Sequence, residues 1–80
     1  MSRAFDSVVK KAQRRMDLPA PAVRRLIRQQ ARLTQENVAE ALGSDRASVS
    51  RWESGERSPR GEMLDAYATL LERLKREVLS

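Results

Sequence analysis

The sequence predicts an all-α fold of five helices joined by short loops. Apolar residues recur at spacings of three and four along the chain, which is the period of an amphipathic helix. No stretch has the apolar and polar alternation that is typical of a strand. Prolines, glycines and capping residues separate the periodic stretches. Because the chain has only 80 residues, we expect the helices to share one small core.

The first predicted helix covers residues 4–16 and has one apolar stripe with basic residues beside it. The stripe comprises Phe5, Val8, Val9, Ala12 and Met16, and the basic residues are Lys10, Lys11, Arg14 and Arg15. Proline ends a helix, and two prolines follow at positions 19 and 21. We therefore assign residues 1–20 to an N-terminal amphipathic helix with its linker, and residues 21–80 to the main domain. The stripe requires cover, either from the domain's own core or from a second copy or another protein partner.

The second predicted helix covers residues 21–32, since a proline at position 21 suits a first turn. Its inward face would comprise Val23, Leu26, Ile27 and Ala31, with Arg24, Arg25, Arg28 and Arg32 around it. The last predicted helix covers residues 61–79. Its inward residues would be Met63, Leu64, Tyr67, Leu70, Leu71, Leu74 and Val78.

Two short helices are predicted between these, at about residues 35–42 and 45–53. Thr34 can cap the first of them and Gly43 can end it. Asp45 or Ser44 can cap the second, which ends before Gly55.

The composition favours a polyanion as partner and argues against catalysis. The net charge is +5 and the isoelectric point is about 10.7. Cysteine and histidine are both missing, so we expect no enzyme activity, no metal site and no cofactor. No run of 18 apolar residues would cross a membrane and no signal peptide is evident, so we expect a cytoplasmic protein without a membrane partner.

The short helix at residues 45–53 has two faces of different chemistry. At the helical period, Val49 and Trp52 point to one side and must be buried. The opposite side carries Arg46, Ala47, Ser50 and Arg51. These residue types suit the major groove of DNA, where arginine bonds guanine, serine bonds a base or phosphate, and alanine contacts a thymine methyl group. The alternative for this face is plain exposure to solvent.

The spacing around this helix is more specific than its composition. Counted from Gln35, a small residue comes fifth at Ala39 and a glycine ninth at Gly43, followed by apolar anchors at Val49 and Trp52. A tight turn between crossed helices requires a glycine and a small residue at such positions. Residues 23–71, with the motifs LTQENVAEALG and SVSRWESGERSP, resemble the helix-turn-helix family of phage repressors and Cro, often called the Xre family.

The resemblance implies a compact five-helix bundle of the lambda-repressor-like type, to which the N-terminal amphipathic helix is added or in which it is counted. It implies phosphate contacts for five residues: Gln35, Ser48, Ser54, Gly55 and Arg57. It also implies a partly buried salt bridge between Arg28 and Glu53. The family usually has an apolar residue at position 44, where this chain has serine.

The function predicted from these features is a sequence-specific regulator of transcription that binds double-stranded DNA, a repressor or Cro-like protein of a phage or bacterium. The resemblance implies a homodimer on an inverted-repeat operator. The alternative is an antitoxin, or another protein-binding module that also binds its own promoter DNA.

Overall fold

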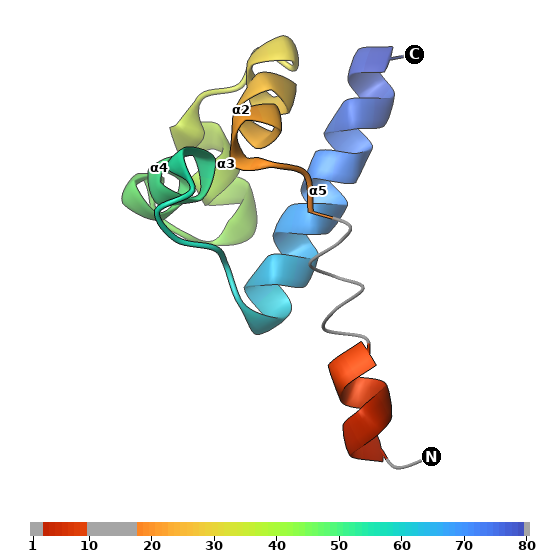
Figure 1. The fold of residues 1–80 in the computed structure, drawn as a ribbon. Coiled ribbons are helices and arrows are strands. Elements are labelled where there is room, and N and C mark those ends of the chain that lie inside the picture. Colours follow the sequence, from red (N-terminus) through yellow and green to blue (C-terminus); the bar gives the residue numbers. More distant parts are fainter. Residues whose placement is uncertain (1–2, 10–17, 80) are drawn as a thin grey trace.

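The computed structural model describes residues 3–9 and 18–79, and every regular element in these residues is a helix (Figure 1). Residues 3–9 are helical, and four further helices follow. They are α2 (Pro21–Gln30), α3 (Gln35–Leu42), α4 (Arg46–Ser54) and α5 (Gly61–Leu79). The predicted all-α fold is confirmed. The rest of the first predicted helix, residues 10–16, lies outside the described residues.

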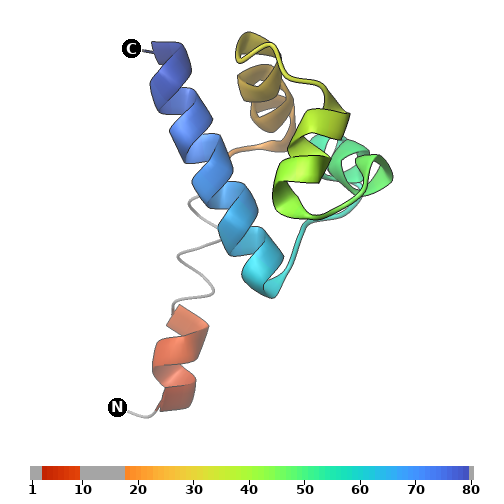
Figure 2. The ribbon, with the colours of Figure 1, turned by 180° about the vertical axis from the view of Figure 1, so that it is seen from behind.

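The long helix α5 supports the three shorter helices. In both ribbon views α2, α3 and α4 lie together on one side of α5 (Figures 1 and 2). The core between them comprises Ile27, Val38, Ala39, Val49, Trp52, Tyr67 and Leu71. The rings of Trp52 and Tyr67 lie at its centre, with centroids 4.9 Å apart and planes tilted by 42°. Each of the four helices contributes at least one of these buried side chains.

The ends of α3 are defined by local hydrogen bonds. Thr34 accepts a bond from the backbone of Asn37 at 3.0 Å, and the Asn37 side chain accepts one from the backbone of Thr34 at 2.9 Å. This reciprocal pair satisfies two amides that a helix start otherwise leaves without partners. Gly43 ends the helix in the left-handed region at φ 65°, which glycine adopts without strain. These contacts set the tight turn into α4.

The structure corrects the inward face of α2. Val23 and Leu26, predicted to be buried, are 43% and 52% exposed, whereas Arg24 is only 7% exposed. The helix therefore points Arg24, Ile27 and Arg28 toward its neighbours, a face rotated from the one that hydrophobicity alone selects. The predicted end at residue 32 is also wrong, because α2 ends at Gln30.

Arg24 is buried because backbone carbonyls accept its hydrogen bonds. Its Nε donates to the carbonyl of Pro19 at 2.6 Å, and its Nη1 donates to the carbonyl of Trp52 at 3.0 Å. Burial lowers the pKa of Arg24, although a guanidinium stays charged in proteins. The side chain thereby joins the segment before α2 to the C-terminal half of α4.

The hydroxyl of Tyr67 is the basis of a first prediction. The side chain is 1% exposed, and its hydroxyl has no hydrogen-bond partner among the described residues. Burial raises its pKa to about 12. The neutral form is therefore favoured by folding, and the associated stability is complete below pH 10 and is lost as the pH rises toward 12.

We expect Tyr67→Phe to leave the protein at least as stable at neutral pH, since an unsatisfied buried hydroxyl costs about 1–3 kcal/mol. The variant should also lose the stability change between pH 10 and 12. Thermal unfolding followed by the fluorescence of Trp52, the single tryptophan, measures both effects. A variant that is clearly less stable at pH 7 would show that the hydroxyl makes a favourable bond.

Candidate nucleic-acid interface

The outer face of α4 carries four exposed side chains. Arg46, Ala47, Ser50 and Arg51 are all exposed, as the sequence pattern predicts. On the opposite face Val49 has no exposed surface and Trp52 is 6% exposed. The core contacts of α4 therefore leave the four outer residues available to a partner.

Asp45 begins α4 as its N-cap. Its carboxylate accepts a hydrogen bond from the backbone amide of Ser48 at 2.8 Å. Hydrogen bonds from the amide and hydroxyl of Ser48 hold the pKa of Asp45 below its ordinary value, and the charge of Arg51 acts in the same direction. The carboxylate is thus engaged at the start of the helix.

The loop after α4 is ordered by hydrogen bonds to the last turn of the helix. Ser54 Oγ donates to the carbonyl of Arg51 at 3.1 Å and accepts from the backbone amide of Glu56 at 3.3 Å. The amide of Arg57 donates to the same Arg51 carbonyl at 3.3 Å. Gly55 allows this path because its φ is 81°, and a Cβ there would lie 3.3 Å from the Pro21 side chain.

A polar hollow beside α4 gathers three arginines. It is lined by Ser48, Arg51, Trp52, Glu56, Arg57, Ser58 and Arg60. Arg51 and Arg57 were predicted from the sequence, whereas Arg60 was not, although it directly follows the motif SVSRWESGERSP. Arginine clusters of this kind match the geometry of phosphate groups.

A second hollow, on the other side of the C-terminal end of α4, adds another arginine that sequence analysis missed. Arg25 lies with Gln35, Ser50, Glu53 and Ser54 around this hollow. Arg25 is exposed, while the neighbouring Arg24 and Arg28 are directed inward. The sequence presents all of these arginines alike, so only the rotation of α2 distinguishes the one that faces solvent.

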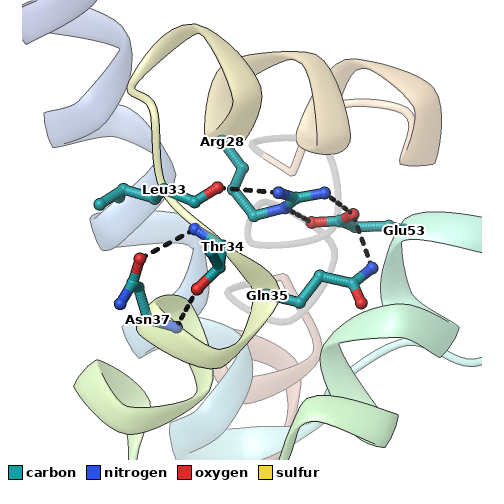
Figure 3. Close-up of polar contacts among 6 residues, drawn as sticks. All are labelled: Arg28, Leu33, Thr34, Gln35, Asn37 and Glu53. Atoms are coloured by element: carbon teal, nitrogen blue, oxygen red, sulfur yellow. Dashed lines mark hydrogen bonds and ion pairs between the residues drawn. The ribbon is translucent and has the colours of Figure 1, made fainter.

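Glu53 is the centre of a polar network between α2, α3 and α4 (Figure 3). Arg28 donates to both of its carboxylate oxygens, from Nε at 2.6 Å and from Nη2 at 2.9 Å. Gln35 Nε2 donates to Oε1 at 3.1 Å. The third nitrogen of Arg28 donates to the carbonyl of Leu33 at 2.8 Å.

The ion pair at the centre of this network is shielded from solvent. The side chains of Arg28 and Glu53 are 11% and 3% exposed. The bond to Glu53 raises the pKa of Arg28, against the opposing effect of burial. Bidentate arginine pairs are directional, so this contact fixes how α4 lies against α2. Gln35 extends the same restraint to the first turn of α3.

A family comparison agrees with this geometry. A helix-turn-helix family model of the Xre/Cro/CI type matches residues 25–78, from the first turns of α2 to nearly the end of α5. The chain belongs to that family. The family has the lambda-repressor-like all-α fold and binds DNA, and its members are typically not enzymes. Comparison with curated proteins and with solved structures gives no significant match.

α3 and α4, joined by the tight turn at Gly43, are the two helices of the helix-turn-helix motif. Among residues 3–9 and 18–79, no three carboxylates gather in a way that would hold a metal ion. In the same part of the chain, no helix is long and apolar enough to cross a membrane.

The Arg28–Glu53 pair leads to a prediction about stability. Arg28→Met would leave a carboxylate that is 3% exposed without its cation, and should cost about 3–5 kcal/mol of unfolding free energy. The double variant Arg28→Met/Glu53→Met should recover most of this loss, because no buried charge remains. Urea unfolding of the wild type, both single variants and the double variant provides the cycle. Additive losses in the double variant would contradict a coupled pair.

The cap at Asp45 leads to a prediction about stability at low pH. Its lowered pKa means that its cap stabilises the fold above pH 3.8 and that this contribution is lost as the pH falls through the lowered value. An asparagine at this position would cap equally well without titrating. We expect Asp45→Asn to match the wild type at pH 7 and to exceed it in melting temperature below pH 3.8. Asp45→Ala should be less stable than both at pH 7. If the melting temperatures of the wild type and the Asn variant fell in parallel as the pH is lowered, the assignment of Asp45 as a titrating cap would be wrong.

Proposed function

We propose that the protein is a sequence-specific regulator of transcription that binds double-stranded DNA with α4 in the major groove. The observation that supports this most directly is the outer face of α4. Its two arginines, Arg46 and Arg51, are exposed together with the small residues Ala47 and Ser50. The buried side of the same helix is fixed to the core by Val49 and Trp52. A rigid helix of this composition is suited to contact base edges.

The base contacts follow from side-chain chemistry. Arg46 and Arg51 each have a planar guanidinium that can donate two parallel bonds to O6 and N7 of guanine. Ser50 can donate to or accept from a base edge, and the methyl group of Ala47 can contact thymine. Arg46 lies in the first turn, the end of a recognition helix that usually enters the groove.

The phosphate contacts would surround these base contacts. Arg57 and Arg60 border one side of α4, and Arg25 with Gln35 borders the other. We also assign phosphate contacts to Ser48, Ser54 and Gly55, which flank the outer face of α4. Such contacts carry little sequence information but supply affinity that falls with salt. The net charge of +5 favours the approach to DNA.

Regulation would consist of occupying an operator and would have no catalytic step. Two-fold operators are bound by symmetric dimers whose recognition helices enter the groove about one helical turn apart. We propose that this protein acts in that way, as a homodimer and as a repressor or Cro-like factor on an inverted repeat. Whether it comes from a phage or from a bacterium, the protein would act in the bacterial cytoplasm, where the DNA lies.

Selection from a random pool of duplex DNA at near-physiological salt tests this function directly. An enriched inverted repeat would support a symmetric dimer that recognises sequence. A single enriched half-site would support sequence-specific binding and contradict the proposed dimer. Binding without enrichment that disappears as salt rises would contradict sequence-specific regulation, because only phosphate attraction would remain.

The selected site then allows a prediction for single residues. Arg46→Ala or Arg51→Ala should weaken binding to this site by about 1–3 kcal/mol and relax the preference at one base pair. Arg73→Ala is the matched control, since it removes the same charge from an exposed position on α5. Fluorescence anisotropy with the selected site and single-base variants measures both effects. If Arg46→Ala and Arg73→Ala behave alike, the assignment of the α4 face is wrong.

A further inference from the structure

An apolar groove lies between α2 and the C-terminal half of α5. It has a volume of about 290 Å³, and its apolar lining includes Pro19, Val23, Leu26, Ile27, Leu71 and Val78. Leu26 and Val23 on its α2 side are 52% and 43% exposed. Arg24 and Arg28 occupy the inward face of α2 through their polar contacts. The most apolar edge of this helix therefore remains outside and forms one side of the groove.

A second exposed apolar surface lies on the N-terminal helix of the same chain. Phe5, Val8 and Val9 are 54%, 65% and 38% exposed. Their spacing of three and four residues places them on one face of a helix. An apolar helix face and an apolar groove are complementary, and burying each against the other would remove both from water.

The course of the chain directs this helix away from its own groove. Pro19 lines the groove, but Leu18 lies in a different hollow with Ser58, Pro59 and Leu64, near the N-terminal end of α5. From Pro19 back to Leu18 the chain thus leaves the groove on the side of the opposite end of α5. In both ribbon views residues 3–9 lie beyond that end (Figures 1 and 2). The helix is therefore better placed to reach another molecule.

We propose that the N-terminal helix of one copy packs in the α2–α5 groove of a second copy, with Val8 and Val9 against Leu26 and Val78. Repeating the contact by two-fold symmetry fills both grooves and closes a dimer. This interface depends on residues 3–9, which precede the matched family segment 25–78. None of the residues that line the groove lies on α4, and the contact, which would supply the interface of the proposed homodimer, does not require DNA.

Disulfide trapping tests the contact, since the chain has no cysteine of its own. A tagged Val8→Cys chain is mixed with an untagged Leu26→Cys chain and oxidised without DNA. The matched control replaces Leu26→Cys by Glu40→Cys, an exposed position on α3. We expect the Val8–Leu26 heterodimer to form at least about tenfold faster than the Val8–Glu40 one, because only the first pair lies within a buried contact.

The single-chain variant Val8→Cys/Leu26→Cys distinguishes the two possible occupants of the groove. An exchanged helix predicts covalent dimers on a non-reducing gel. A covalent monomer, with its disulfide inside one chain, would show that the helix fills its own groove and would overturn the proposal. Preferential Leu26–Leu26 linkage in the mixture would overturn it as well, since two grooves would then face each other.

Sedimentation of uncrosslinked protein gives a second measurement. Val8→Asp should raise the dimer dissociation constant by at least about tenfold, because it puts a charge into the apolar contact. Ser7→Asp adds the same charge to the same helix and should change that constant by no more than about twofold. Equal effects of the two variants, or a wild type that stays monomeric at all concentrations, would refute the exchange. All these readouts omit DNA, so a failure here is separate from a failure of DNA binding.

Discussion

The contact on which the arrangement depends is the carboxylate of Glu53, held by Arg28 and Gln35 from two other helices. It lies one residue after the buried Trp52, so the restraint acts where α4 enters the core. Hydrophobic packing alone is tolerant of small rotations, whereas a bidentate ion pair is not. The three helices are thus fixed in angle as well as in proximity, and the direction of the outer face of α4 follows from that angle.

Two arginines of α2 hold this helix against α4 by different chemistry. Arg28 is neutralised by a carboxylate, while Arg24 is held by the carbonyls of Pro19 and Trp52. Both contacts reach α4 from α2. Their combined effect is that α2 packs by a partly charged face, and its apolar residues Val23 and Leu26 remain at the surface. The polar contacts of Arg24 and Arg28 therefore account both for the apolar groove beside α2 and for the orientation of α2 against α4.

Local chemistry made most of the fold predictable from sequence. Thr34, Gly43 and Asp45 are caps whose role depends only on near neighbours, and the structure has them at the expected helix ends. The exposed set on α4 followed from helical period. The face of α2 did not, since Val23 with Leu26 and Arg24 with Ile27 are equally spaced, and the second pair is favoured by the hydrogen bonds of Arg24 to the carbonyls of Pro19 and Trp52, which no periodicity shows. The same rotation separates Arg25 from its neighbours, which no periodicity could do.

The division of α4 into two faces also bears on how such a protein can change over evolution. Arg46, Ala47, Ser50 and Arg51 are exposed, and their side chains lie outside the buried core to which Val49 and Trp52 belong. Substitutions at exposed positions of this kind usually alter stability by no more than about 0.5 kcal/mol. The residues that face outward can therefore be exchanged freely while Val49, Trp52 and Glu53 keep the scaffold intact. The surface chemistry of α4 can in this way change through a few mutations, without loss of the stability of the fold.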